Sequence, residues 1–387
     1  MTEPAWTPRA ETIERANLTA AVRQLGLADH RALHAWSVAD RAGFWQHVVD
    51  RLGVVFAEPA RSILDGSATH PVWLPGARLN IALSCFAGDH DRPAVVHNSR
   101  GSIAVVSVGD LWHRSSRFAA SLHRGGVRPG DRVAIAMAMN LESVVAYLGT
   151  VLAGAAVVSI ADSFSPAEIA TRLGLTDPVL IVTQDRVERS GRELPMLAKV
   201  FEASGPTAIV VDTGGGAQLR PGDRWWDDFV AADASGWAAV IRDAADESNI
   251  LFSSGTTGEP KAIPWSHLTP IKAAMDGHFH QDVHPGDIVA WPTNLGWMMG
   301  PWLIYASLLN GAAMALYDDA PTGRGFLEFV SAVGVNVLGV VPSLVAAWRS
   351  SGATEGVDLR RVRVLSSTGE ASNPDDYRWL MERVGAP

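Results

Sequence analysis

Residues 250–264 read ILFSSGTTGEPKAIP, and they give the clearest local indication of a fold and a site. The first three residues are an apolar run of the kind that forms a buried strand. Small hydroxyl residues, two glycines and then Lys261 follow. Glycines permit tight turns in which backbone N–H groups converge on one point. Hydroxyls, free amides and one cation suit a polyphosphate, so the stretch predicts a phosphate-binding loop. A plain polar surface turn is the alternative.

The loop differs from the G-x-x-x-x-G-K-[ST] pattern, in which the lysine lies at the start of a helix. Here Pro260 precedes Lys261, and a proline disfavours the helical conformation at the residue before it. We therefore expect a loop, and not a helix N-terminus, to hold the phosphates. Lys199, Lys261 and Lys272 are the only lysines, which favours a specific need for an ammonium group at Lys261.

The segment SSGTTGEPK closely resembles the phosphate loop of the adenylate-forming superfamily, which includes acyl-CoA synthetases, luciferases and peptide-synthetase adenylation domains. The family pattern usually ends Pro-Lys-Gly, whereas this chain has Ala262. The resemblance implies an ATP site in which Lys261 and Thr257 are catalytic. The ATP-binding residues that it implies in this loop are Ser253, Ser254, Gly255, Thr256, Thr257, Gly258 and Lys261.

Composition narrows the classes of partner. The 387 residues suffice for more than one domain, and a net charge of -9 argues against nucleic acid. Cys85 is the only cysteine, which excludes an intrachain disulfide and fits a reducing cytosol. Residues 1–9 do not resemble a signal peptide, so we expect a cytoplasmic location. Asn140 and Glu142 interrupt the most apolar region, which predicts strand–helix–strand and not a membrane span.

Apolar runs alternate with helical patterns from residue 103 onward, which predicts an α/β fold with parallel sheets flanked by helices. A mainly helical leader precedes it. Ser165-Pro166 predicts a helix start, with serine as the cap and proline at the first position, and Ser266 predicts another cap. The expected strands are 133–137, 155–160, 179–182, 208–211, 288–291, 312–317, 336–341 and 362–365, and the expected helices include 141–152, 325–333 and 375–384.

The leader carries WLPGARLNIA at residues 73–82, which resembles the N-terminal segment of acetyl-CoA synthetases and their close relatives. Peptide-synthetase adenylation domains generally lack this segment. The resemblance divides the chain into a helical leader at 1–88 and a partial AMP-binding (adenylation) domain at 89–387. The C-terminal lid domain of the family is absent from this sequence.

Arg189-Ser190-Gly191-Arg192 suggests where CoA binds. From the residues alone, a solvated basic turn explains these arginines. Acetyl-CoA synthetases carry R-x-G-R at the corresponding place, and guanidinium groups pair with phosphate in a fork. The resemblance therefore implies CoA binding by Arg189 and Arg192, together with Asn336 and Met299.

Residues 293–301, TNLGWMMGP, resemble the acyl-pocket segment of the family and especially that of plant acyl-activating enzymes. The resemblance places Trp297, Met298 and Met299 in the acyl pocket, although methionines also fill ordinary core gaps. Bulky methionines suggest a short acyl chain. Residues 366–371, SSTGEA, resemble the adenine-binding turn at the carboxyl end of a strand. That turn implies adenine contacts from Gly369, Glu370 and Ala371, with Thr368 bordering the acyl pocket.

His278, His280 and His284 cluster in the sequence, but their spacing and neighbours complete no metal site that we would predict. Mg²⁺ is expected with ATP, and its main ligand in the family belongs to a Y-G-x-T-E segment that this chain lacks. A T-G-D aspartate and a late catalytic lysine are missing as well.

The resemblance implies an AMP-forming acyl-CoA synthetase, an acid–thiol ligase that uses a small carboxylate, ATP and CoA. We expect the chain to be incomplete and inactive alone. A catalytically silent nucleotide- or CoA-binding module, or half of a split enzyme, is the second hypothesis. An adenylation domain serving a carrier protein is a third, which the leader segment, Arg189 and Arg192 disfavour.

Overall fold

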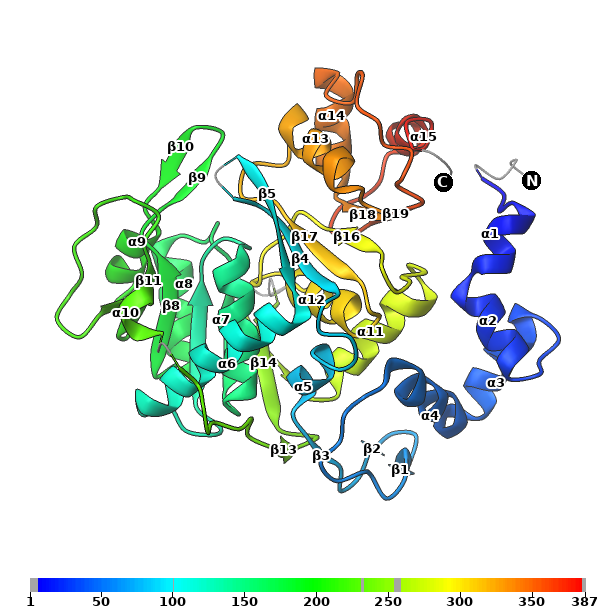
Figure 1. The fold of residues 1–387 in the computed structure, drawn as a ribbon, viewed down its shortest axis with the longest axis horizontal. Helices are drawn as coiled ribbons and strands as arrows, with labels where there is room; N and C mark the ends of the chain where they lie inside the picture. Colours follow the sequence, from blue (N-terminus) through cyan, green and yellow to red (C-terminus); the bar gives the residue numbers. More distant parts are fainter. Residues whose placement is uncertain (1–5, 100, 231–232, 254–258, 385–387) are drawn as a thin grey trace.

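The computed structural model describes residues 6–99, 101–230, 233–253 and 259–384. The leader packs at one end of the molecule, where α2 and α4 contact α11 (Thr269–Phe279) (Figure 1). Its helices are α1 (Ala10–Arg15), α2 (Asn17–Gln24), α3 (His30–Ala39) and α4 (Arg41–Leu52). A hairpin of β1 (Leu64–Gly66) and β2 (Pro71–Trp73), strand β3 (Arg78–Leu79) and α5 (Ile81–Cys85) lead into the sheets.

The first large sheet has seven strands among the described residues. Its strands are parallel except for the edge strand β15, which pairs antiparallel with β14. In spatial order the strands are β12 (Arg224–Trp225), β11 (Ala208–Val211), β8 (Leu180–Gln184), β6 (Arg132–Ala136), β7 (Ala156–Ile160), β14 (Glu247–Phe252) and β15 (Ala262–Ser266).

The second large sheet has six strands in the described ranges and, like the first, is mainly parallel with one antiparallel edge strand. It is parallel except for the edge strand β5, which pairs antiparallel with β4. In spatial order the strands are β19 (Val364–Ser367), β18 (Val337–Val340), β16 (Ile288–Ala290), β17 (Ala313–Leu316), β4 (Pro93–Ser99) and β5 (Ser102–Ser107).

Side chains of the parallel strands alternate between two cores, because successive residues of a strand point to opposite faces. In β6, Val133 and Ile135 join the large central core, whereas Ala134 and Ala136 join an outer core. The strands therefore read as continuous apolar runs, as expected for sheets covered on both faces. The outer helices are α8 (Pro166–Thr176) and α9 (Met196–Glu202) on the first sheet, and α13 (Arg324–Val333), α14 (Pro342–Ser351) and α15 (Pro374–Met381) on the second.

The central layer contains α6 (Val108–Arg124), α7 (Leu141–Leu152), α11 and α12 (Met299–Leu308). Helix α7 packs on β6 and β7 of the first sheet, and α12 packs on β16 and β17 of the second. The rings of Tyr147 and Tyr305 meet edge to face across this layer at 6.0 Å between centroids. The predicted α/β class, with parallel sheets flanked by helices, is confirmed.

Two predicted helix caps had different outcomes. Ser165 caps α8, where it forms a capping box with Glu168 and precedes Pro166 at the first turn. Ser266 does not cap α11, because it is the last residue of β15 and the helix begins at Thr269 after Leu268. Its Oγ accepts a hydrogen bond from Leu268 N, so the serine closes the short turn between strand and helix. Within the described residues, no helix is long and apolar enough to cross a membrane.

Two buried histidines make the stability of the fold depend on pH. Burial lowers the pKa of His267 and of His278 to about 4. A histidine in the unfolded chain has a pKa near 6.5. As pH falls from about 6.5 toward 4, the unfolded state therefore binds protons that the folded state does not bind, and the unfolded state is stabilised. We expect each histidine to lower the free energy of unfolding by about 2 kcal/mol between pH 8 and pH 5.

The measurement is urea unfolding at both pH values for the unsubstituted chain, His267→Asn and His278→Asn. Asparagine retains an acceptor for the Ile81 N–H, which His267 Nδ1 accepts at 3.3 Å. Each variant should lose about 2 kcal/mol less than the unsubstituted chain between the two pH values. Equal losses in all three proteins would contradict the assignment.

Candidate active site

The main cavity has a volume of about 690 Å³ and lies where strands of both large sheets end. Parallel strands place their carboxyl ends at one edge, which is where open α/β sheets bind ligands. Five of its lining segments directly follow strands. These are Asp162 and Ser163 after β7, residues 291–294 after β16, Tyr317 and residues 319–321 after β17, Val341 after β18, and residues 368–370 after β19.

The cavity brings together predicted residues from three separate motifs. They are Arg189 of the CoA motif, Trp297, Met298 and Met299 of the acyl segment, and Thr368, Gly369 and Glu370 of the last turn. The predicted Ala371 is exposed and does not line the cavity. The predicted loop residues Ser254, Gly255, Thr256, Thr257 and Gly258 lie outside the described residues.

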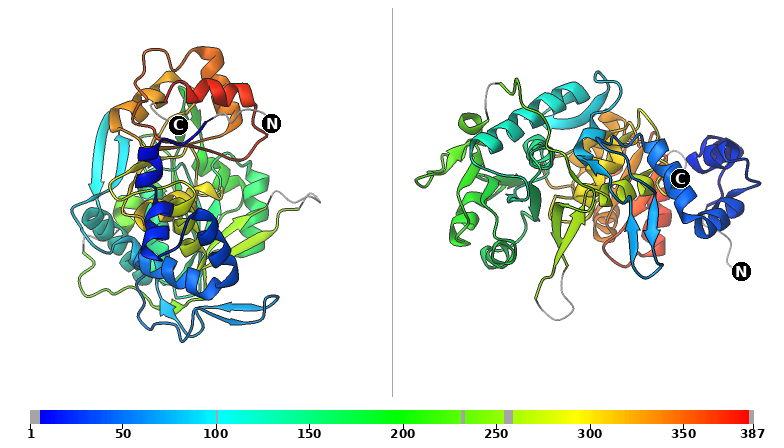
Figure 2. Two further views of the ribbon diagram at one scale, coloured as in Figure 1. Left: turned by 90° about the vertical axis from the view of Figure 1, so that its right-hand side faces the viewer. Right: turned by 90° about the horizontal axis from the view of Figure 1, so that it is seen from below.

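Ser253 and Lys261 form the last described pair of the β14–β15 hairpin. Ser253 N donates to Lys261 O at 3.0 Å, and Lys261 N donates to Ser253 Oγ at 3.4 Å. Lys261 is exposed, and neither residue lines the main cavity. The two strands extend outward from the body of the molecule (Figure 2). A lysine in this position is free to meet a phosphate that approaches from solvent.

The acyl segment is held by close backbone packing. A Cβ at Gly296 would lie 2.1 Å from Ala161 N, and one at Gly300 would lie 2.2 Å from Asn294 O. Only glycine lets these segments approach so closely. Trp297 and Met298 are then left about half exposed, and the Trp297 ring meets Phe164 edge to face at 5.7 Å between centroids.

The turn after β19 is anchored by its acidic residue. Gly369 has a φ of 94°, a conformation that favours glycine. The Glu370 carboxylate accepts from Ser343 N and from Ser343 Oγ, both at 2.9 Å. Ser343 lies in the first turn of α14, where backbone N–H groups are otherwise unpaired and a negative charge is favourable. Glu370 therefore ties the predicted adenine turn to the start of a helix.

The two predicted CoA arginines occupy different environments. Strands β9 (Val187–Arg189) and β10 (Arg192–Leu194) form a hairpin in which Arg189 and Arg192 are directly paired. Arg189 Nη2 lies 2.5 Å from the Asp162 carboxylate. Arg192 is exposed and forms no ion pair with the described residues. The available guanidinium for an external phosphate is therefore that of Arg192.

Asp162 is a functional candidate that the sequence did not indicate. Its side chain is fully buried, and its Oδ1 accepts from Asn294 Nδ2 at 2.8 Å. Burial raises the pKa of Asp162, whereas the charges of Arg189 and Lys199 act in the opposite direction. Asp162 and Asn294 are 132 positions apart, so no local pattern joins them. An aspartate directly after an apolar strand, as in SIADS, was the available signal.

Asn336 does not line the cavity, because it is the residue before β18 and so lies at the opposite end of that strand. Its Oδ1 accepts from Ile288 N at 2.9 Å, and its carbonyl accepts from Arg363 N and Val364 N. These bonds tie the starts of three neighbouring strands together. The structure gives Asn336 a structural role and does not bring it near the other predicted site residues.

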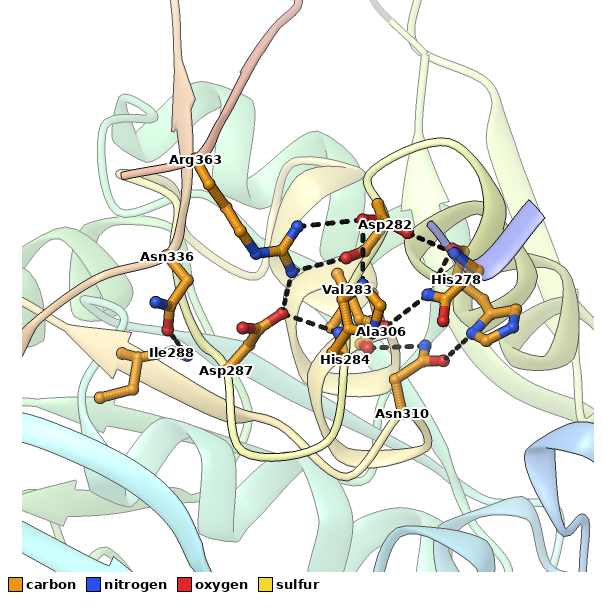
Figure 3. Close-up of polar contacts among 11 residues, drawn as sticks. His278, Asp282, Val283, His284, Asp287, Ile288, Ala306, Asn310, Asn336 and Arg363 are labelled. Atoms are coloured by element: carbon orange, nitrogen blue, oxygen red, sulfur yellow. Dashed lines mark hydrogen bonds and ion pairs between the residues drawn. The ribbon is translucent and has the colours of Figure 1, made fainter. Parts of the chain in front are cut away.

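The three histidines at 278–284 have separate partners. His278 Nδ1 lies 3.1 Å from Asn310 Oδ1, and His284 Nε2 lies 2.9 Å from Asp282 Oδ2 (Figure 3). His280 lies beside Asp276 instead, at 3.6 Å. Among the described residues, no three potential ligands gather around a common point.

Comparison with known proteins supports the family that the sequence motifs resemble. The family model described as AMP-binding enzyme matches residues 85–387, and the model described as acetyl-coenzyme A synthetase N-terminus matches residues 30–85. The chain belongs to the AMP-binding enzyme family. Within that family it is of the acyl-CoA synthetase type.

Curated relatives include the "Probable acyl-activating enzyme 17, peroxisomal" of Arabidopsis thaliana, which is 42% identical over 98% of this chain and 57% of its own length. The hexanoyl-CoA synthase of Cannabis sativa is 41% identical over the same shares. The acetyl-coenzyme A synthetase of Escherichia coli K12 is 31% identical over 81% of this chain and 51% of its own length.

A solved acetoacetyl-CoA synthetase from Streptomyces lividans has a similar fold, with a TM-score of 0.90 and 29% identity. The match covers 99% of this chain and 62% of that one. The chain therefore spans between about half and three fifths of the length of the relatives named here.

The close approach at Gly296 can be tested by substitution. In Gly296→Ala the new Cβ would lie within 2.6 Å of backbone atoms of residues 160–161, and backbone atoms cannot yield as a flexible side chain does. We expect a loss of about 1–3 kcal/mol in the free energy of unfolding, measured by urea denaturation. Displacement of Trp297 should also change the tryptophan fluorescence.

Gly174→Ala is the matched control, because nothing lies within 4 Å of a Cβ there and the residue is inside helix α8. It should be neutral or stabilising by about 0.5–1 kcal/mol. Unchanged stability and emission in Gly296→Ala would show that the segment is less tightly held than the structure indicates.

Proposed function

We propose that this chain is the N-terminal portion of an AMP-forming acyl-CoA synthetase that activates a short-chain carboxylate and passes it to CoA. One observation carries the proposal. A single cavity at the carboxyl ends of the strands is lined by the acyl segment, the predicted adenine turn and Arg189, next to the turn of the arginine hairpin. An acyl-adenylate needs an apolar region for its acyl group beside a surface for its adenine. The CoA thiol must also reach the acyl carbonyl, which lies between these two regions.

In the proposed reaction, a carboxylate oxygen attacks the α-phosphorus of ATP and pyrophosphate leaves. The CoA thiol, on losing its proton, then attacks the acyl carbonyl and AMP leaves. Both reactants of the first step are anions, so charge neutralisation is the main requirement. ATP would bring Mg²⁺, which supplies part of that neutralisation. We assign no described residue as an Mg²⁺ ligand, because the carboxylates that line the cavity accept hydrogen bonds from protein groups.

The residues that the sequence predicts for the site would divide the remaining work. Lys261, with Ser253, would meet the phosphates together with Ser254, Gly255, Thr256, Thr257 and Gly258. Gly369 and Glu370 would pack against the purine, and Thr368 with Trp297 to Met299 would bound the acyl group. Arg192 would bind the phosphate end of CoA, while Arg189 would act from within its ion pair with Asp162.

The proposed length of the acyl chain follows from two methionines. Met298 and Met299 line the cavity, and bulky side chains there favour a short acyl chain. Relatives named for acetyl and hexanoyl substrates mark the range to be compared. A series of linear acids from two to eight carbons, assayed by hydroxamate trapping in the complete enzyme, would place the optimum.

The second candidate is a silent nucleotide- or CoA-binding module, or half of a split enzyme. The chain spans 57% of two relatives and 62% of the solved one, and binding of MgATP or CoA without pyrophosphate exchange would support this candidate. We keep the cytoplasm as the proposed compartment, although two plant relatives carry the word peroxisomal in their names.

Lysine 261 gives the sharpest test of the phosphate site. Lys261→Ala should weaken MgATP binding to the 387-residue chain about 10- to 100-fold, because a hydrogen bond to a charged group is worth about 1.5–3 kcal/mol. Isothermal titration calorimetry measures the affinity. Lys272→Ala is the matched control, because that ammonium is paired with Asp276 at 2.6 Å and should leave MgATP affinity unchanged.

The same chain should show negligible acyl-CoA formation by itself. Robust turnover by the purified 387 residues would contradict the expectation of an incomplete enzyme. Restoration of pyrophosphate exchange by a separately added C-terminal piece would favour the split-enzyme candidate. Equal MgATP affinity in Lys261→Ala and the unsubstituted chain would remove Lys261 from the site.

A further inference from the structure

Arg172 is a buried arginine without a carboxylate partner. It lies in helix α8 and is only 7% exposed, and its Nη1 donates to Glu168 O at 2.8 Å. Among the described residues, its guanidinium forms no ion pair and its Nε has no hydrogen-bond partner. A charge left alone in the interior is costly, and an unsatisfied buried polar group calls for an explanation.

Two aromatic rings hold the Arg172 guanidinium. Its central carbon lies 3.8 Å from the ring centroid of Phe164 and 5.3 Å from that of Phe252. Such cation–π contacts stabilise a cation but do not neutralise it. The nearest acidic residue along the helix, Glu168, uses its carboxylate to accept from Ser165 N and Ser165 Oγ, both at 2.8 Å. The charge of Arg172 is therefore available to an anion that comes from outside the chain.

The same two rings place Arg172 between the two parts of the proposed site. Phe252 is the last residue of β14 and directly precedes Ser253, which pairs with Lys261 in the hairpin. Phe164 meets the ring of Trp297 edge to face at 5.7 Å between centroids, and Trp297 lines the main cavity. A nucleotide with its adenine in the cavity and its phosphates at Lys261 would have to cross the region between these two rings.

The other cations near this region are engaged by protein groups. Arg189 is the only lysine, arginine or histidine among the described residues that line the cavity, and its Nη2 lies 2.5 Å from the Asp162 carboxylate. Lys199 Nζ donates to the carbonyl oxygens of Asp162 and Phe164, at 3.0 and 3.1 Å. Lys199 therefore fixes the segment that carries the Phe164 ring, and Arg172 stacks on that ring.

We propose that Arg172 is a second cation of the phosphate site, which attracts the phosphates of a nucleotide that spans the cavity and the β14–β15 hairpin. This inference rests on the proposed function, because it concerns the ATP of the same reaction. Arg172 acts through its charge, which is screened less in a buried position than at the surface. We assign it no contact with the reacting atoms.

The experiment measures the affinity of the 387-residue chain for MgATP and for adenosine by isothermal titration calorimetry. Arg172→Met removes the charge and keeps an unbranched apolar side chain between the rings. It should weaken MgATP binding at least fivefold and adenosine binding less than twofold, because adenosine carries no phosphate. Arg172→Lys restores a positive charge and should bind MgATP at least threefold more tightly than Arg172→Met. A purely structural role would instead weaken both ligands by the same factor.

Arg220→Met is the matched control. Arg220 also stacks on a phenyl ring, that of Phe201 at 4.4 Å, but it is paired with Asp223 at 2.9 Å and does not line the cavity. This variant should leave both affinities unchanged.

If Arg172→Met does not fold, Arg172→Gln carries the test, since it is also uncharged and keeps a donor for Glu168 O. A folded uncharged variant that binds MgATP as tightly as the unsubstituted chain, or that loses adenosine affinity by the same factor, would overturn the inference and leave the proposed function standing. Failure of the unsubstituted chain to bind MgATP would overturn both.

Discussion

Burial of helices α7 and α12 in the central layer is the constraint on which the rest of the structure depends. Every residue of α7 except Glu142 is buried, and α12 is buried from Gly300 to Leu308. A helix that is apolar on all sides has no face for water, so it must be covered all round. The two large sheets, one against each helix, provide that cover together with the neighbouring helices α6 and α11. The ring contact of Tyr147 with Tyr305 joins the helices within the shared central core.

This packing decides where a ligand can bind. With α7 on β6 and β7, and α12 on β16 and β17, the carboxyl ends of strands from both sheets border one cavity. Small residues then allow the loops to approach. A Cβ at Gly339 would lie 1.9 Å from the indole of Trp291, so glycine in β18 makes room for a ring that lines the cavity. The cavity is therefore a consequence of core packing and not of loop sequence alone.

Local chemistry explains what could be predicted from the sequence. Apolar runs covered on both faces, and the cap at Ser165-Pro166, act over a few residues, so the strands and α8 were predictable. Long-range geometry explains what could not. The pairing of Asp162 with Asn294 depends on how two sheets meet, and the distance of Asn336 from the cavity depends on which end of its strand it occupies. Ser266 was misjudged because a residue that ends a strand can carry the same hydroxyl as a helix cap.

The placement of charge separates the site into two parts. Around the cavity, Asp162, Asp319 and Glu370 are each held by hydrogen bonds from protein groups, so their carboxylates cannot reorient freely toward a ligand. Such a wall suits the uncharged parts of a ligand, namely an acyl chain and a purine. Lys261 lies outside this wall on the β14–β15 hairpin, exposed to solvent. A cation at that hairpin need not be desolvated before an anion arrives, which agrees with the phosphate loop that the sequence predicts there. The glycines, hydroxyls and lysine that predict the phosphate loop are neighbours in the sequence, whereas the residues that line the cavity come together only in the folded chain.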